Sequence, residues 1–437
     1  MKLTMEKVVY GGLGLARIPA AEGARAGKRI FVPFTLPGEQ VTADLREETR
    51  GHAIGNLLHV EEASPLRTAP VCPHFMRCGG CHLQHATAAA QVEIKREVLQ
   101  ETLERAGVKH LPGISILQAG PLHYRNRMRL HVQTRPDFRT GQRGQKTHAI
   151  VPLEQCPIVA PVLERCLQSL RTMGAANAVP DGVTEMEFFC NHDASSVLLR
   201  AFAAQSDRQL LASCGAFFPA LQMQTPELAG AALFLRNADR KAAPEAQALL
   251  RWKTQELAYR VGTRTYQVSI ASFFQTNRLL LDDFVALVCD GLHGRQAWDL
   301  YAGVGLFARV LAENFAHVTA VEASPASIRD LRHNLDGLPA TIAPSTTADF
   351  LRRALDQRAV SPDLVVVDPP RAGLGAETTL LLARCRPQRI VYVSCDPATL
   401  SRDLKSLIES GHRLDRLHMV EMFPQTYHQE TVAVLVR

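Results

Sequence analysis

The chain has 437 residues, of which 46% are apolar, and a formal net charge of +6. This apolar share is normal for a folded protein and argues against general disorder, and the length predicts about three domains. No run of about 18 apolar residues occurs and the start lacks the apolar core of a signal peptide, so we expect a cytoplasmic protein without a membrane segment. Ten cysteines are too few for a disulfide scaffold, which leaves metal ligation, catalysis or burial as explanations.

The net positive charge comes from residues 121–150, which carry seven basic side chains and one acidic side chain, Asp137. Because side chains alternate along a strand, Arg125, Arg127 and Arg129 would share one face if this segment is extended. A solvated hairpin face is the ordinary explanation of such a run. Contact with a polyanion at one place is the functional explanation.

Residues 1–62 read as short strands broken by glycines, which predicts a small β-barrel. Its expected strands include residues 7–10, 29–34 and 40–45. After a linker, residues 86–106 have helical spacing. The apolar stripe of that helix consists of Val92, Val98, Leu99 and Leu103. Residues 114–270 are β-rich in pattern, without an obvious fold.

From residue 272 onward, strand-like runs alternate with helical stretches, which predicts a mostly parallel sheet covered on both faces. The runs lie at residues 297–301, 317–322, 363–368, 389–394 and 431–436.

The first of these strands ends in a glycine-rich turn, DLYAGVG at residues 299–305. Glycines let the backbone approach a ligand closely, and open α/β sheets bind ligands at the carboxyl ends of their strands. Glu322 ends the next strand, where a Rossmann-like site places an acid on ribose hydroxyls. Ala308 stands where the dinucleotide fingerprint has its third glycine, so the turn indicates a cofactor other than NAD. A tight turn without a ligand is the alternative.

Two later strands end in DPPR (368–371) and SCDP (394–397), where the prolines force the chain out of the sheet. Cys395 is thereby placed at the ligand edge as a candidate nucleophile, the alternative being a buried structural cysteine. Glu430, just before the last strand, is either an ordinary surface acid or a general base at the same edge.

Four cysteines outside this region have the spacing of a metal site. They are Cys72, Cys78, Cys81 and the distant Cys156. Such a set can form a tetrahedral site for zinc or for a [4Fe–4S] cluster, and the spacing does not distinguish the two. The site would also fasten the arginine-rich segment, which lies between Cys81 and Cys156. The other cysteines except Cys395 are expected to be buried.

Five motifs in this order resemble the RNA uracil-5-methyltransferases that use S-adenosylmethionine. They are FFQTN (273–277), DLYAGVG (299–305), DPPR (368–371), SCDP (394–397) and FPQTYHQE (423–430). The sequence KVVYGGLGLAR (7–17) resembles the TRAM domain that many members carry. The resemblance is greatest to the branch that methylates 23S rRNA and contains an iron–sulfur cluster. Leu306 departs from the pattern, since some relatives have Asn there, and this position therefore lacks one cofactor hydrogen bond of those relatives.

The resemblance implies a role for each candidate residue. S-adenosylmethionine would contact Gln275, Tyr301, Gly303, Gly305, Glu322 and Asp368. Cys395 would be the nucleophile that adds to C6 of uracil, and Glu430 the base that removes the C5 proton. A [4Fe–4S] cluster would be held by Cys72, Cys78, Cys81 and Cys156. RNA, presented as an unstacked loop, would be contacted by Arg125, Arg127 and Arg129.

Together these inferences predict a multidomain α/β protein. We expect a TRAM-like, RNA-binding β-barrel at 1–62, a central β-rich domain with the cluster at 63–270 and a Rossmann-like methyltransferase domain at 271–437. The expected activity is 5-methyluridine formation in RNA, with 23S rRNA as substrate and a monomeric enzyme. A transfer RNA methyltransferase is one alternative, and a non-catalytic RNA-binding or ribosome-assembly factor is another. A cytosine-5 enzyme would use similar thiolate chemistry, but the motif at 423–430 fits uracil better.

Overall fold

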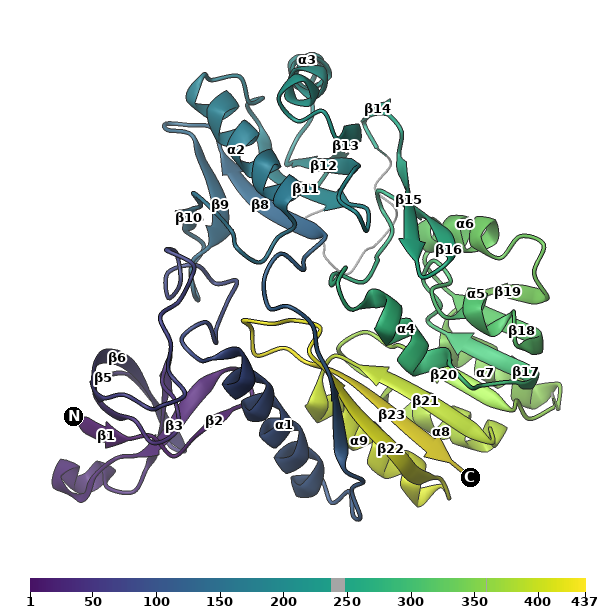
Figure 1. Ribbon diagram of the computed structural model, residues 1–437, viewed down its shortest axis with the longest axis horizontal. Coiled ribbons are helices and arrows are strands. Elements are labelled where there is room, and N and C mark those ends of the chain that lie inside the picture. Colours follow the sequence, from purple (N-terminus) through teal and green to yellow (C-terminus); the bar gives the residue numbers. More distant parts are fainter. Residues whose placement is uncertain (237–247, 359) are drawn as a thin grey trace.

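The computed structural model describes residues 1–236, 248–358 and 360–437. Three groups of elements follow one another along the chain, each built around its own sheet (Figure 1). None of the helices in the described part of the chain is long and apolar enough to cross a membrane.

The N-terminal group is a six-stranded sheet in the order β1-β5-β6-β4-β3-β2. Its strands are β1 (Lys2–Thr4), β2 (Lys7–Val9), β3 (Leu13–Arg17), β4 (Arg29–Pro33), β5 (Gln40–Glu48) and β6 (His52–Glu62), with a 3-10 helix, η1, at Ala20–Arg25. Alternate side chains of these strands fill one apolar core that includes Ile30, Val32 and Val41. The predicted strands are confirmed, whereas closure into a barrel stays a prediction, since β1 and β2 are the two ends of the hydrogen-bonded order.

The central group is a seven-stranded sheet in the order β10-β9-β8-β11-β12-β13-β14. Its strands are β8 (Arg127–Gln133), β9 (Arg139–Arg143), β10 (Ile150–Pro152), β11 (Val183–Cys190), β12 (Val197–Ala203), β13 (Leu228–Leu235) and β14 (Leu250–Lys253). Two helices that the sequence pattern did not reveal, α2 (Pro161–Ala175) and α3 (Arg208–Gln224), pack against this sheet and share its core. The hairpin of β15 (Glu256–Val261) and β16 (Arg264–Ser269) packs instead on the core of the C-terminal group.

The C-terminal group is an eight-stranded sheet in the order β19-β18-β17-β20-β21-β23-β22-β7. Its strands are β17 (Gly294–Leu300), β18 (Phe315–Glu322), β19 (Ala340–Pro344), β20 (Leu364–Val367), β21 (Arg389–Ser394), β22 (Arg413–Val420), β23 (Glu430–Val436) and β7 (Ile114–Leu117). The five strands from β19 to β21 are parallel, and β23 runs antiparallel to both its neighbours. The predicted mostly parallel sheet is confirmed.

Helices cover both faces of this sheet. Successive residues of each strand point to opposite faces and therefore belong to two separate cores. Ala297 packs with α4 (Leu281–Cys289), α5 (Ala308–Leu311) and α6 (Pro325–Asn334), whereas Trp298 belongs to the core on the other face. That second core holds the helices α1 (Ala88–Arg105), α7 (Thr347–Asp356), α8 (Gly375–Cys385) and α9 (Pro397–Glu409).

The segment from α1 to β7 comes early in the chain yet lies with the C-terminal group (Figure 1). The predicted helix is confirmed: Thr87 caps its first turn, and Val98, Leu99 and Leu103 are buried. β7 pairs in parallel with β22 and so becomes the edge strand of the eight-stranded sheet. This segment therefore connects the N-terminal sheet directly to the edge of the sheet that carries the candidate site.

Candidate functional site

The topology brings the candidate site residues to one edge of the C-terminal sheet. Asp368 and Cys395 follow the parallel strands β20 and β21, and the glycine turn follows β17, so all three lie at the carboxyl ends. β23 runs in the opposite direction, and its first residue, Glu430, therefore meets the same edge. Ser394 pairs with Thr431, which sets Cys395 and Glu430 across from each other.

A cavity of about 600 Å³ opens at this edge. Among its lining residues are seven of the predicted catalytic and cofactor residues: Gln275, Tyr301, Gly303, Glu322, Asp368, Cys395 and Glu430. The volume is in the usual range for a small-molecule site. Sequence positions that are more than 150 residues apart therefore converge in one pocket, as the family resemblance implied.

The glycine turn and Glu322 are joined by direct hydrogen bonds. The N–H of Gly303 donates to Oε2 of Glu322 (2.8 Å), while Oε1 accepts from the N–H groups of Ala323 (2.8 Å) and Ser324 (2.7 Å). Tyr301 and Gly303 both have positive φ, 66° and 57°, so the chain turns sharply here. The turn holds the Glu322 carboxylate in the wall of the cavity.

Gly305 is not among the residues that line the cavity. Its φ is 89°, and a Cβ at this position would lie 2.7 Å from Cδ1 of Leu331 on α6. Glycine is required because the turn packs closely against that helix. The structure thus gives Gly305 a packing role, whereas Gly303 faces the cavity.

Burial raises the pKa values of three ionisable groups in this cavity, Cys395, Asp368 and Glu430. Burial, with the nearby Glu430 as a second cause, raises the pKa of Cys395 to about 12, although Arg371 acts to lower it. Burial raises the pKa of Asp368 to about 7 and that of Glu430 well above its ordinary value, with Asp368 as a second cause for Glu430. The raised pKa favours the thiol form of Cys395, and positive charge nearby favours its ionisation.

Arg371 is the functional candidate to which the sequence interpretation gave no role. It lines the cavity, and it lowers the pKa of both Cys395 and Glu430. Its position in the DPPR motif, directly after a strand that ends at the cavity, is the sequence feature that could have identified it. Phe273 lines the same cavity and has 67% of its surface exposed.

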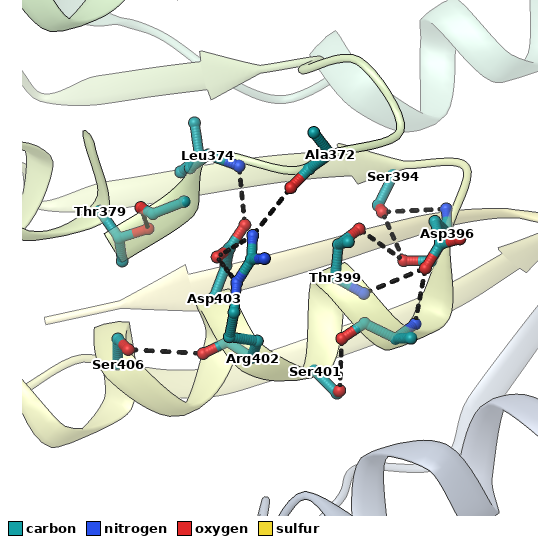
Figure 2. A network of polar contacts seen from close by, with 12 residues as sticks. Ala372, Leu374, Thr379, Ser394, Asp396, Thr399, Ser401, Arg402, Asp403 and Ser406 are labelled. Carbon is teal, nitrogen blue, oxygen red and sulfur yellow. Dashed lines mark hydrogen bonds and ion pairs between the residues drawn. The ribbon is translucent and has the colours of Figure 1, made fainter. Parts of the chain in front are cut away.

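A network of polar contacts along α9 reaches the loop after DPPR and the end of β21 (Figure 2). Asp396 caps α9 by accepting from the N–H groups of Ala398 (2.9 Å) and Thr399 (3.0 Å). The hydroxyl of Thr399 donates to the carbonyl oxygen of Arg371 at 3.1 Å. Because Asp396 directly follows Cys395, the helix cap sets where the thiol leaves the strand.

A second part of the same network centres on Asp403. Its Oδ2 accepts from the N–H of Leu374 (2.7 Å) and from the hydroxyl of Tyr392 (2.7 Å), while Arg402 Nε donates to Oδ1 (2.9 Å). Arg402 also donates to the carbonyl oxygen of Ala372 (2.8 Å), as Figure 2 shows. The loop after DPPR is therefore tied to α9 at several points.

The four predicted cluster cysteines line one small cavity of about 150 Å³ in the central group. None of them forms a disulfide, and burial raises the pKa of each thiol. Across residues 1–236, 248–358 and 360–437, no three His, Cys, Asp or Glu side chains are arranged tightly enough to hold a metal ion. Four cysteine thiolates are the ligand set that a [4Fe–4S] cluster requires.

The remaining cysteines other than Cys395 are buried, as expected. They are Cys166, Cys190, Cys214, Cys289 and Cys385.

Three arginines of the basic segment, Arg125, Arg127 and Arg129, line the cysteine cavity. Arg127 and Arg129 differ in exposure. Arg127 forms an ion pair with Glu187 at 2.8 Å, lies over the ring of Phe189 and has only 14% of its side chain exposed. Arg129 also has a carboxylate partner, Glu185, yet 52% of its side chain is exposed. Of these two, Arg129 is the one that is open to solvent on the surface.

Comparison with known proteins agrees with these motifs. The family model described as tRNA (Uracil-5-)-methyltransferase matches residues 245–437. An uncharacterized RNA methyltransferase of Aquifex aeolicus is 31% identical over 100% of this chain and 98% of its own length. The chain belongs to the RNA uracil-5-methyltransferase family.

Two further relatives illustrate the range of this family. A 23S rRNA (uracil(1939)-C(5))-methyltransferase of Halomonas elongata is 31% identical over 99% of this chain and 89% of its own. The Pyrococcus abyssi tRNA (uracil-54, C5)-methyltransferase, solved in complex with S-adenosyl-L-homocysteine, has 23% identity and a TM-score of 0.76 over 100% of both chains. The latter match shows that the fold is the one this family uses.

Proposed function

We propose that this protein transfers a methyl group from S-adenosylmethionine to C5 of a uridine in 23S rRNA. The observation that carries the proposal is the single cavity that contains Cys395, Glu430, Asp368 and the glycine turn with Glu322. Several relatives with about 30% identity over nearly the whole chain are named 23S rRNA (uracil(1939)-C(5))-methyltransferases, which supports this choice of RNA.

The chemistry of uracil explains why a thiol and a carboxylate are needed together. C5 of uracil is too weak a nucleophile to take a methyl group directly. Addition of the Cys395 thiolate to C6 forms a C–S bond and moves the C5=C6 electron pair onto C5 as an enolate. S-adenosylmethionine, when bound, supplies an electrophilic methyl carbon on a sulfonium. Covalent catalysis of this kind divides one difficult step into easier ones.

Glu430 completes the proposed reaction as the general base. It takes the proton from C5, the C–H electron pair restores the C5=C6 bond, and the C6–S bond breaks to release the Cys395 thiolate. Such proton transfer contributes ~10²–10⁴-fold to rate. Burial and the nearby Asp368 raise the pKa of Glu430 well above its ordinary value, so its action as a base calls for positive charge at the cavity. Arg371 lowers this pKa, and a cationic methyl donor, when bound in the cavity, would act in the same direction.

The remaining regions would serve the RNA. Residues 1–62 would form the TRAM-like RNA-binding domain, and residues 271–437 the catalytic domain. Residues 63–270 would form the central domain, except for α1, β7 and the β15–β16 hairpin, which pack with the C-terminal group. The four cysteines that share one cavity would hold a [4Fe–4S] cluster, whose thiolate ligands would fasten β8 and its arginines in place. The target uridine would enter from an unstacked loop, since a stacked base exposes C6 poorly.

The decisive experiment combines purified protein, S-adenosylmethionine and 23S rRNA fragments. We expect 5-methyluridine in the product, and covalent protein–RNA capture on 5-fluorouridine RNA, which Cys395→Ala abolishes. Cys385→Ala, at a buried cysteine on α8, is the matched control and should still capture RNA. Capture by the Cys395→Ala protein would contradict the proposed nucleophile.

A transfer RNA substrate is the second candidate, favoured by the structural similarity to a transfer RNA enzyme. Mass spectrometry of both RNA classes from cells that lack this protein distinguishes the two. Loss of a 5-methyluridine from 23S rRNA alone supports the proposal, and loss from transfer RNA alone overturns the choice of substrate. No change in either class, together with RNA binding but no methyl transfer in vitro, would indicate a non-catalytic factor.

A further inference from the structure

The loop that leads into Glu430 is held by two side chains of α1. This loop, residues 421–429, joins β22 to β23, and α1 lies more than 300 residues earlier in the sequence. Gln91 and Lys95 are four residues apart on α1, so they project from the same face of the helix. Both are buried, and both reach the loop.

Gln91 fixes the middle of the loop through Gln425. Its Oε1 accepts from the N–H of Gln425 (2.8 Å) and its Nε2 donates to Oε1 of Gln425 (3.0 Å). The carbonyl oxygen of Gln425 accepts from the N–H groups of His82 (2.9 Å) and Leu83 (3.0 Å). Gln425 has a φ of 70°, a left-handed conformation that a residue with a side chain keeps only when its surroundings hold it.

Lys95 fixes the beginning of the loop. Its ammonium group pairs with the carboxylate of Glu421 and donates to the carbonyl oxygen of Phe423 at 3.1 Å. The side chains of Lys95 and Glu421 are 2% and 5% exposed. Breaking a buried ion pair of this kind leaves an uncompensated buried charge, so the pair holds the start of the loop to α1.

Glu430 itself lacks comparable support. In the backbone it pairs with Val420 across β22 and β23, so both ends of the loop are fixed in neighbouring strands. Its Oε1 is buried and has no hydrogen-bond partner within the described residues, and the same is true of both polar atoms of the Gln429 side chain. The direction of the carboxylate therefore depends on how the loop delivers the backbone to β23.

We propose that Gln91 and Lys95 are positioning residues that aim the Glu430 carboxylate at C5 of the substrate uracil. The inference rests on the proposed function. It predicts a selective defect: thiolate addition and methyl transfer proceed, while removal of the C5 proton is slowed. A change that only destabilised the protein would slow all steps together.

The test compares Gln91→Ala and Gln91→Glu with the wild type on two RNA substrates. On RNA containing 5-fluorouridine the C5 fluorine cannot leave as a proton, so the rate of adduct formation reports every step before the base acts. On RNA with tritium at C5 of uridine, tritium release reports the base itself. We expect adduct formation within about twofold of wild type and tritium release slowed by about tenfold or more, since small misplacements of a catalytic group cost up to about 10²-fold. Adduct on the natural RNA should accumulate on a denaturing gel.

Gln100→Ala is the matched control, because Gln100 is on the same helix and bonds to Arg96 and Glu104 of α1. It should leave both rates unchanged. Equal losses in both assays, or a failure of both Gln91 variants to fold, would assign Gln91 to stability and overturn the proposal, as would tritium release at the wild-type rate. Absence of adduct and of tritium release in the wild type would instead overturn the proposed function.

Discussion

Cys395 and Glu430 face each other across two antiparallel strands, because β21 and β23 pair with Ser394 opposite Thr431. Cys395 lies just beyond the end of β21, and Glu430 is the first residue of β23. This arrangement places the proposed nucleophile and the proposed base next to each other at one edge of the sheet. It also lets the two groups influence each other, since Glu430 is one cause of the raised pKa of Cys395.

Glu430→Gln should separate the two halves of the proposed reaction. Glutamine has nearly the same shape but cannot accept the C5 proton, so the methylated adduct should persist while turnover falls by ~10²–10⁴-fold. Denaturing gels of protein mixed with RNA and S-adenosylmethionine measure the adduct. Glu409→Gln, at an exposed acid on α9, serves as the control and should show only transient adduct. An adduct level equal to that of the control would argue against Glu430 as the base.

Glu322→Gln should weaken binding of the methyl donor and its product. The carboxylate is held by the N–H groups of Gly303, Ala323 and Ser324, so it presents a fixed, charged acceptor to the cavity. Hydrogen bonds to charged groups contribute about 1.5–3 kcal/mol, which corresponds to roughly a tenfold or greater rise in Kd. Isothermal titration with S-adenosylhomocysteine measures this change. Asp336→Asn, at an exposed acid after α6, should bind normally, and equal affinities for the two variants would exclude the assigned role.

The candidate site could be predicted well from the sequence because its residues lie at strand ends. Proline after Asp368, proline after Asp396 and the glycines after Tyr301 all mark places where a strand must stop. The carboxyl ends of neighbouring parallel strands share one edge of the sheet. Local sequence signals that end each strand therefore predict that these residues lie close together in space. The five motifs then identify the family.

Other parts of the arrangement depend on long-range contacts that no local pattern records. β7 is a four-residue strand, and nothing near Ile114 indicates that it will pair with β22. The helices α2 and α3 lie in residues 114–270, where the alternation typical of strands was the main signal in the sequence. The partner of Arg127 is Glu187, which lies on a neighbouring strand 60 residues away, so alternation correctly predicted a strand but not the neutralisation of its charge.

The different exposed fractions of Arg127 and Arg129 predict unequal roles in RNA binding. Reversal of both Arg127 and Arg129 to Glu should weaken RNA binding and flatten its salt dependence. With the structure, Arg129→Gln should reduce the slope of log K against log salt by about 0.7–0.9, the value of one phosphate contact. Arg127→Gln should chiefly lower stability, because it leaves the mostly buried Glu187 with fewer cationic partners. Filter binding at several salt concentrations and thermal melting separate the effects, and identical slopes for Arg129→Gln and wild type would refute the contact.

Asp299 predicts a specific pH dependence of stability. Its carboxyl is buried beneath the glycine turn, where Oδ2 accepts the N–H of Ala308 at 2.8 Å, and burial raises its pKa from 3.8 to about 8. Between these two values the folded state keeps a proton that the unfolded chain releases, so this group lowers the free energy of unfolding as pH rises from about 4 to about 8. Asp299→Asn is neutral at all pH values and retains an acceptor for Ala308. From pH 5 to pH 7.5 the variant should therefore lose less stability than wild type, by more than about 1 kcal/mol. Urea unfolding of the ligand-free protein measures the difference, with exposed Asp290→Asn as control. Parallel stability profiles for Asp299→Asn and wild type would show that Asp299 is ionised in the fold.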